Sequence, residues 1–375
     1  MADIPKECKG AVVVDEGPNF RVEVRNVAVP EIGPEDVLIK INATGLCMSD
    51  VHFMSNDWGI APMSYFGTQC AGHEGAGVIV KVGERVKRLK VGQRAGFKPI
   101  AETCGWCDLC ISGQDQYCAA AKLTGFLTDG ESTGYQGKRL HANAAIGTYK
   151  QYLRSPEAYT TLIPDGVPDH IAGPVMCSAS TMYSSLKESG LRPGDWAVFV
   201  GGGGGVGIQG VQLASAMGIR PIVVDSGREK RKVALEYGAE AFLDFKESKN
   251  VAAEAVATCG GIGAHGVFVT AGEGYPTALS FLGNRVGGKV MCVALPTVGL
   301  YPMNVNAAEL ITKKKSISGT MVSSMADVHK TLEFAQRGIL RLRPEIVGLS
   351  KFNDAVQRLK KGEVAGRIVV DFNLE

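Results

Sequence analysis

The chain lacks the features that would place it in a membrane or on a nucleic acid. Among its 375 residues no apolar run approaches the roughly 20 residues that cross a bilayer. Its 40 basic and 38 acidic residues leave a net charge of +2, without the basic surplus of nucleic-acid-binding proteins. No internal repeat is present, and low complexity is confined to one glycine-rich loop. We therefore expect neither a membrane nor a nucleic-acid partner.

The N-terminus also lacks the pattern of a secretory signal, so we expect a cytoplasmic protein with reduced thiols. Four of its ten cysteines stand close together in CGWCDLCISGQDQYC: Cys104, Cys107, Cys110 and Cys118. The gaps of two, two and seven residues suit four thiolates around one tetrahedral Zn²⁺. Such a closed site is structural. A pair of disulfides and chance clustering are the alternatives.

A catalytic zinc site would need about three protein ligands and a free position. Candidate ligands and acid–base groups occur in three short motifs. They are Cys47, Ser49, Asp50 and His52 in GLCMSDVH, His73 and Glu74 in GHEGAG, and Cys177 in GPVMCSAS. Each motif is weak alone, because a single cysteine in an apolar run is usually a small core residue.

The segment WAVFVGGGGGVGIQGVQLASAMGIRPIVVD predicts one strand–helix–strand unit. Its apolar pattern indicates strands at 196–200 and 221–225, a loop at 201–205 and a helix at 206–217. Glycines in that loop match G-x-G-x-x-G in the context of a dinucleotide-binding turn, in more than one register. We expect the cofactor to contact Gly202, Gly204, Gly205, Val206 and Gly207. A glycine-rich linker is the alternative.

Asp225 ends the second strand of this unit. A carboxylate there accepts a hydrogen bond from the adenosine ribose 2′-hydroxyl and repels a 2′-phosphate. The sequence therefore favours NAD over NADP.

The strand pattern changes character along the chain and indicates two kinds of sheet. Short alternating segments broken by glycines, from about 10 to 175, favour antiparallel sheet. From about 178 to 321, strands alternate with helices, which favours a doubly wound parallel sheet. The predicted class is α/β, with a β-rich domain beside a Rossmann domain.

Several motifs, in order along nearly the whole chain, now carry a family resemblance. They are CMSDVH, GHEGAGVIVKVG, VGQRAG, CGWCDLC with Cys118, GPVMC, GDWAVFVGGGGGVG, VVD and VAGRIVVDF. The chain resembles the zinc-dependent alcohol dehydrogenases of the medium-chain dehydrogenase/reductase superfamily, most closely the yeast and fungal type. The resemblance implies a GroES-like catalytic domain over 1–177 and 322–375, and a Rossmann NAD-binding domain over 178–321. It also implies two Zn²⁺ per subunit, NAD, and a homo-oligomer, with a tetramer favoured over a dimer.

The resemblance also assigns roles to single positions. Cys47, His73 and Cys177 correspond to the catalytic zinc ligands, and Glu74 to a nearby carboxylate. Asp50 corresponds to the acid that orients the zinc-bound histidine. The remaining correspondences are Ser49 and His52 as a proton relay, Lys230 beside the adenosine ribose, and Arg367 near the pyrophosphate.

The implied reaction follows from the metal. A Lewis-acid zinc lowers the pKa of a bound hydroxyl, so that the alkoxide forms near neutral pH and NAD takes its hydride. His52 is placed to receive the displaced proton. We expect reversible oxidation of primary and secondary alcohols to aldehydes and ketones. A polyol dehydrogenase and a catalytically silent NAD-binding redox or structural protein are the alternatives; Cys177 argues against the first, since polyol enzymes usually carry a carboxylate there.

Three departures from the yeast-type pattern bear on specificity. Met48 replaces a basic residue that contacts the pyrophosphate, which is expected to weaken cofactor binding. Pro99 stands where short-alcohol enzymes place a bulky aromatic, so a pocket lined by Trp58, Pro99 and Leu295 should admit bulky or aromatic alcohols. The segment around 127–146 is longer than in yeast-type enzymes, which suits a lid, an oligomer contact or a surface insertion.

Overall fold

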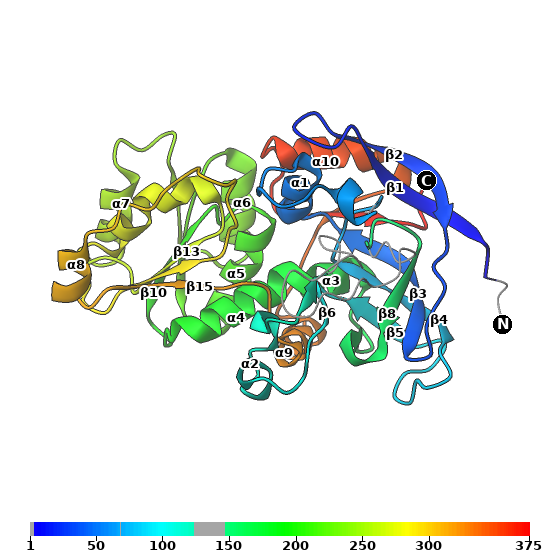
Figure 1. Cartoon of the computed structure of the whole chain (residues 1–375). Coiled ribbons are helices and arrows are strands. Elements are labelled where there is room, and N and C mark those ends of the chain that lie inside the picture. Colours follow the sequence, from blue (N-terminus) through cyan, green and yellow to red (C-terminus); the bar gives the residue numbers. More distant parts are fainter. Residues whose placement is uncertain (1–3, 68, 124–146) are drawn as a thin grey trace.

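The structure, a computed structural model, describes residues 4–67, 69–123 and 147–375. Two large sheets lie side by side, a parallel one with its helices and a mainly antiparallel one (Figure 1). The long segment predicted around 127–146 lies outside the described residues. No helix of the described ranges is both long and apolar enough to cross a membrane.

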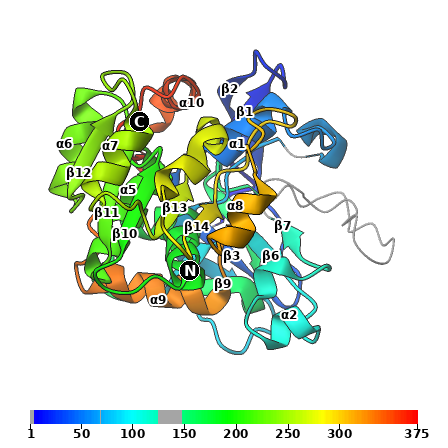
Figure 2. The ribbon, with the colours of Figure 1, turned by 90° about the vertical axis from the view of Figure 1, so that its left-hand side faces the viewer.

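The parallel sheet is built by six strands from the middle of the chain. They are β10 (Trp196–Val200), β11 (Arg220–Asp225), β12 (Ala241–Asp244), β13 (Gly266–Val269), β14 (Lys289–Cys292) and β15 (Ser316–Gly319). Their order is β12-β11-β10-β13-β14-β15, and every neighbouring pair is parallel. The winding direction reverses between β10 and β13, and ligands of such sheets bind at that switch point. Figure 2 shows β10, β11 and β12 toward one side of the molecule.

Helices cover both faces of this sheet, which explains why its strands read as continuous apolar runs. Phe199 of β10 packs in one core cluster with Val211, and the preceding Val198 packs in another with Phe281. The elements that supply this cover are α4 (Ser180–Ser189), α5 (Gly205–Ala216), α6 (Arg228–Glu236), α7 (Val251–Thr258) and the 3₁₀ segment η5 (Gly272–Leu282). Helix α8 (Ala307–Thr312) has no buried residue.

The second sheet combines strands from both ends of the chain. It contains β3 (Asp36–Gly45), β4 (Gly75–Val82), β5 (Arg94–Phe97), β8 (Tyr152–Pro156), β9 (Thr160–Leu162), β16 (Glu345–Val347) and β17 (Ile368–Asp371). All pairs are antiparallel except β16 with β17. Because β17 pairs with the end of β3, Val369 lies opposite Gly45, and the C-terminal segment reaches the centre of the N-terminal sheet.

The remaining elements complete the fold. The remaining strands are β1 (Glu7–Val14), β2 (Arg21–Ala28), β6 (Ile100–Glu102) and β7 (Lys122–Leu123). The remaining helices are α1 (Met48–Ser55), α2 (Asp108–Ile111), α3 (Asp169–Pro174), α9 (Met325–Gln336) and α10 (Phe352–Lys360), with the 3₁₀ turns η1 (Met63–Phe66), η2 (Asp115–Tyr117), η3 (Glu157–Tyr159) and η6 (Leu349–Lys351) and the π-turn η4 (Val175–Ala179). Helix α9 packs against α4 and η4.

The predicted fold class is confirmed, with small shifts at element ends. The glycine-loop helix begins at Gly205 and ends at Ala216, one residue before the predicted bounds at each end. The following strand begins at Arg220 instead of Pro221. These shifts leave the strand–loop–helix–strand unit as predicted.

Candidate functional site

Helix α1 places the first group of site residues. Cys47 is its N-cap, in an extended conformation, so its sulfur stands at the positive end of the helix. Asp50, in the first turn, is fully buried, and Ser49 and His52 are half-buried. A short helix thus carries the predicted ligand, its supporting acid and the predicted relay.

His73 is held by a buried carboxylate. Its Nδ1 lies 2.8 Å from Asp50 Oδ1, while Tyr149 Oη donates to Asp50 Oδ2 over 2.8 Å. The backbone N–H of Gly72 donates to the same carboxylate over 3.0 Å. Gly72 has φ +100°, and a Cβ there would meet the Tyr149 ring at 2.4 Å, so glycine is required for this approach. The imidazole Nε2 is left to face the other ligands.

Glu74 and Arg367 form a buried ion pair. Its approach depends on Gly45, where a Cβ would lie 2.0 Å from a Glu74 carboxylate oxygen. The Arg367 guanidinium also reaches the N-terminus of α5, because a Cβ at Gly205 would lie 2.9 Å from Arg367 Nη1. Arg367 therefore links the cluster around Cys47 to the glycine loop.

Cys177 lies in a π-turn between α3 and α4. Pro174 precedes it and has no backbone N–H, which disturbs the regular helical hydrogen bonding. The Cys177 carbonyl accepts hydrogen bonds from Ser180 Oγ at 3.1 Å and Thr181 Oγ1 at 2.7 Å. These bonds fix the turn that presents the Cys177 sulfur.

The ligand atoms of Cys47, His73, Glu74 and Cys177 all lie within 4.8 Å of one another, and all four residues are buried. A hydrogen bond with Cys177 lowers the pKa of the Cys47 thiol well below its usual value, against the opposing effect of burial. Burial alone would lower the pKa of His73, but Asp50 and Cys47 raise it to about 10. Within the described part of the chain, Glu74 Oε1 has no hydrogen-bond partner. Two sulfurs, a ring nitrogen and an unsatisfied buried carboxylate oxygen are a donor set that fits Zn²⁺.

The second cysteine group lies on an exposed lobe formed by α2, η2 and their flanking turns. The sulfur atoms of Cys104, Cys107, Cys110 and Cys118 lie within 4.8 Å of one another. Backbone N–H groups point at these sulfurs: Cys107 donates to Cys104 over 3.4 Å, and Ala120 donates to Cys118 over 3.4 Å. Hydrogen bonds of this kind stabilise the thiolate form. The one from the Trp106 backbone N–H lowers the pKa of Cys104 to about 6. All ten cysteines are free thiols in the structure, and the four sulfurs of this group converge on one point instead of forming two separate pairs.

The glycine loop connects β10 to α5 at the switch point of the parallel sheet. A Cβ at Gly202 would meet Phe199 at 2.9 Å, and one at Gly207 would meet Gly202 Cα at 2.5 Å, so both keep the loop tight. Gly204 differs, since its Cβ would meet nothing closer than 3.4 Å. We infer that Gly204 leaves room for a ligand at the helix N-terminus.

Asp225 closes the far side of this loop. Its carboxylate accepts from the Gly203 N–H at 3.0 Å and from Lys230 Nζ at 2.9 Å. The Ser226 N–H donates to it as well, over 2.8 Å. The predicted pair Asp225 and Lys230 therefore stands together at the end of β11.

Comparison with known proteins shows the family to which these motifs belong. Residues 33–165 match the family described as Alcohol dehydrogenase GroES-like domain, and residues 205–337 match Zinc-binding dehydrogenase. An alcohol dehydrogenase of Schizosaccharomyces pombe is 34% identical over 373 residues, 99% of each chain. Alcohol dehydrogenase 1 of Neurospora crassa is 34% identical over 98% of each. The chain belongs to the zinc-dependent alcohol dehydrogenases. Its reaction class is NAD-linked alcohol oxidation, and its cofactors are zinc and NAD, as predicted.

Among solved structures, the zinc alcohol dehydrogenase fold recurs in a cinnamyl alcohol dehydrogenase of Sorghum bicolor. The TM-score is 0.82 at 29% identity, over 98% of each chain. The alcohol dehydrogenase of Aeropyrum pernix, 24% identical with a TM-score of 0.81, shares the fold.

The residues predicted to line the substrate pocket are less tightly grouped than the four-residue cluster of Cys47, His73, Glu74 and Cys177. Trp58 stacks on His52, with ring centroids 5.4 Å apart, and its Nε1 donates to the Leu295 carbonyl over 3.4 Å. The Leu295 side chain is largely exposed, whereas Pro99 is buried between β5 and β6. Met48 is partly exposed at the start of α1.

Sequence reasoning missed several residues that hold this site together. Gly45, Gly72 and Tyr149 support the ligands, and Asp57 contacts the predicted relay histidine at 2.9 Å. Asp57 follows His52 by five residues, and Gly45 and Gly72 are the first residues of the motifs GLCMSDVH and GHEGAG, so all three had a local signal. Tyr149 comes from a distant segment and became visible only in the folded chain.

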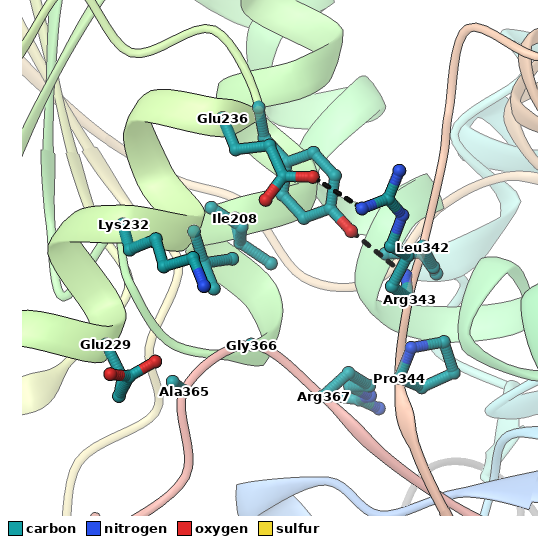
Figure 3. A pocket seen from close by; sticks show the side chains of 12 residues that line it. Ile208, Glu229, Lys232, Glu236, Leu342, Arg343, Pro344, Ala365, Gly366 and Arg367 are labelled. Carbon is teal, nitrogen blue, oxygen red and sulfur yellow. Dashed lines mark hydrogen bonds and ion pairs between the residues drawn. The ribbon is translucent and has the colours of Figure 1, made fainter.

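A cavity of about 140 Å³ lies beside the cofactor loop of the alcohol dehydrogenase (Figure 3). It opens between α6 and the segments 342–344 and 365–367, and its wall includes the ion pair of Glu236 with Arg343 at 2.6 Å. The Gly366 N–H donates to the Gly203 carbonyl, which joins this wall to the loop. None of the four clustered residues lines the cavity, although Arg367, which pairs with Glu74, is part of its wall.

Proposed function

We propose that Cys47, His73 and Cys177 hold a catalytic zinc, and that Cys104, Cys107, Cys110 and Cys118 hold a structural one. The buried four-residue cluster beside the glycine loop carries this proposal. Its fourth member, Glu74, is tied to Arg367 and has one oxygen free to approach the metal. When bound, zinc would supply Lewis-acid polarisation of the substrate hydroxyl, and NAD would supply the hydride acceptor.

We propose that the remaining predicted residues have two roles. One orients the zinc-binding histidine, and the others move the substrate proton. Asp50 fixes the His73 ring through Nδ1, which leaves Nε2 for the metal. Ser49 and His52 are three positions apart on α1 and share a helix face, so the hydroxyl and the imidazole form a path for the substrate proton. The half-buried position of His52 supports transfer from there to water.

We propose that the cofactor lies across Gly202, Gly204, Gly205, Val206 and Gly207, with its adenosine ribose at Asp225 and Lys230. The carboxylate at the end of β11 favours NAD over NADP by repelling a 2′-phosphate. Met48 lacks the positive charge that relatives place on the cofactor pyrophosphate. The Arg367 guanidinium reaches Gly205 in the glycine loop and would replace part of that charge.

We propose primary and secondary alcohols as substrates, bulky or aromatic ones included, because Pro99 leaves open a wall that a large aromatic would close. Trp58 and Leu295, joined by a hydrogen bond from Trp58 Nε1 to the Leu295 carbonyl, would supply the remaining lining. The domain division proposed is 1–177 with 322–375, and 178–321. It is supported by β17 pairing with β3 and by the six consecutive strands of the parallel sheet.

We also propose a homo-oligomer, with a tetramer favoured, in a cytoplasmic setting. β15 is an edge strand of the parallel sheet, and its Ile317 is exposed, as are Val298 and Leu300 after β14. Apolar edges of this kind favour burial against a second copy. A reducing compartment keeps the zinc-binding thiols available.

A substrate panel tests this function. Benzylic and longer-chain alcohols should have higher kcat/KM than ethanol, because a misplacement of about 1 Å in a loose pocket costs roughly a hundredfold in rate. Pro99→Trp, verified as folded and zinc-loaded, should shift the benzyl-to-ethanol ratio back toward ethanol. The wide pocket is contradicted if the unmodified enzyme has the same kcat/KM for ethanol as for benzylic alcohols. It is also contradicted if Pro99→Trp leaves the benzyl-to-ethanol ratio of kcat/KM unchanged. No NADH formation with any alcohol contradicts the function itself.

A further inference from the structure

Lys98 is a fully buried cation that lies directly after β5. Its Nζ donates to the Ser323 backbone carbonyl over 2.9 Å, and it lies 5.6 Å from the centre of the Tyr159 ring. Both of these partners are neutral. Because a buried charge is costly unless its surroundings compensate it, the groups around Lys98 indicate what the ammonium does there.

The negative groups near Lys98 have other partners or belong to the metal site. Burial lowers the pKa of this lysine to about 8, and negative charge at Asp115, Asp327 and Cys177 opposes that effect. Asp327 is already paired with Lys187 at 2.6 Å, and Asp115 belongs to η2 of the cysteine lobe. Cys177 belongs to the buried four-residue cluster. The ammonium therefore lies in the surroundings of the proposed catalytic metal.

A chain of hydrogen bonds leads from Ser323 to this cluster. The Ser323 and Ser180 hydroxyls lie 2.8 Å apart, and Ser180 Oγ donates to the Cys177 carbonyl over 3.1 Å. A hydroxyl has one proton to donate, so Ser323 must donate to Ser180. Both serines are fully buried. The bonds that begin at the Lys98 ammonium thus end at the turn that presents the Cys177 sulfur.

The two serines lie where the chain passes between the two sheets. Helix α3 packs on β3 and β4 of the second sheet, and α4 packs on α5, so η4 and the start of α4 form one passage. Ser323 lies on the return passage, between β15 and α9. The bond between Ser180 and Ser323 joins the two passages, and Lys98 ties the second of them to the end of β5.

We propose that Lys98 is a positioning residue of the catalytic metal site, which holds Ser323 and, through Ser323 and Ser180, fixes the turn that carries Cys177. The inference rests on the proposed role of Cys177 as a zinc ligand. Groups that orient a ligand from outside the metal's own shell change metal affinity or activity by about 10- to 100-fold when they are removed. Without the ammonium, the return passage loses its tie to β5 and the Cys177 turn can move.

The first experiment measures zinc release to a coloured chelator at 25 °C. The phase that is missing in Cys47→Ser identifies the catalytic zinc. In Lys98→Met, which keeps an unbranched side chain but removes the charge and the donors, this phase should be about tenfold faster, while the other phase keeps its rate. Lys98→Arg, which keeps a donor, should recover part of the loss. Ser180→Ala, a smaller change in the same path, should also speed the catalytic phase.

A matched control is Lys315→Met. Lys315 is also buried, and its Nζ donates to the Gly283 backbone carbonyl over 2.8 Å, but it lies outside both metal clusters. This variant should keep both release phases. If it speeds the catalytic phase as much as Lys98→Met does, loss of any buried lysine loosens the fold and the proposal is overturned.

The second experiment reads the geometry of the site. With Co²⁺ in the catalytic site, Lys98→Met and Ser180→Ala should shift the visible absorption bands in the same direction, whereas Lys315→Met should leave them in place. In the zinc enzyme, Lys98→Met should lower kcat and leave the KM for NAD nearly unchanged. Unchanged bands and unchanged zinc release in both Lys98→Met and Ser180→Ala overturn the role of Lys98. Two release phases in Cys47→Ser would instead overturn the proposed catalytic cluster.

Discussion

The two cysteine clusters of this protein use similar atoms in opposite settings. The group from Cys104 to Cys118 comes from 15 consecutive residues on an exposed lobe, and backbone N–H groups donate to two of its sulfurs. The group of Cys47, His73, Glu74 and Cys177 joins segments up to 130 positions apart and is buried. It alone is surrounded by side chains that adjust charge and orientation, among them Asp50 and Arg367.

This contrast favours a stabilising role for the exposed cluster and a chemical role for the buried one. Four thiolates would saturate a tetrahedral metal, and the backbone N–H groups donate to the sulfurs, so the first cluster suits a structural role in its lobe. The second cluster keeps an unsatisfied carboxylate oxygen and a guanidinium that extends to the cofactor loop. Its surroundings suit a metal whose ligands change during a reaction. Variants that act on one cluster at a time test this division.

The largest effect is expected from Cys47→Ser. We expect turnover to fall at least about a thousandfold, because a hydroxyl is a poor zinc ligand and the Lewis acid is lost. Metal analysis should show about one zinc per chain in place of two, with unchanged circular dichroism. Cys259→Ser, at a buried thiol outside both clusters, is the control and should keep both metals. Retention of full activity by Cys47→Ser would refute the assignment of the catalytic cluster.

Cys104→Ser should act mainly on stability. The lobe has little apolar core of its own, since Trp106 and Ile111 are exposed, so the metal must hold it. We expect the apparent Tm to fall by about 10 °C, while the remaining folded enzyme keeps most of its kcat at 25 °C. Thermal melts and initial rates check this. A large loss of kcat without a change in Tm would place chemistry in the exposed cluster.

The smallest effect concerns Lys98, a buried lysine at the end of β5. Its Nζ donates to the Ser323 carbonyl over 2.9 Å. Burial lowers its pKa from 10.5 to about 8, opposed by Asp115, Asp327 and Cys177. Lys98 therefore binds its proton more tightly in the unfolded chain than in the folded one. Below pH 8 the charged Lys98 destabilises the fold, and this destabilisation disappears as the pH rises toward 10.5.

Lys98→Met should therefore flatten the pH dependence of stability. In the unmodified protein this group raises the free energy of unfolding by up to about 3 kcal/mol between pH 8 and 10.5. Chemical denaturation at several pH values measures the slope. Lys249→Met, at an exposed position, should keep it. An equal slope in Lys98→Met would mean that Lys98 is not the group responsible.

Local patterns predicted much of the fold and part of the site. The glycine loop and its flanking strands were correct to within one residue, because strand, turn and helix there depend on neighbouring residues. The clustering of the four cysteines was equally predictable, because the short spacing between them keeps their sulfurs close together. Cys47, His73 and Cys177 were weak candidates singly, and only the family resemblance joined them.

By itself, the sequence determined the two sheets, the closed cysteine knot and the dinucleotide loop, since each depends on periodicity or spacing over a few tens of residues. The tertiary structure alone decided which distant groups meet. The Tyr149 hydroxyl reaches Asp50, Arg367 spans from Glu74 to Gly205, and Asp57 joins His52 to the Val298 backbone. These contacts arise because β17 returns to β3 and because the loop after β14 packs on the turn after α1. Long-range pairing has no period that a linear pattern can reveal, so the chemistry of this site became visible only when the chain was folded.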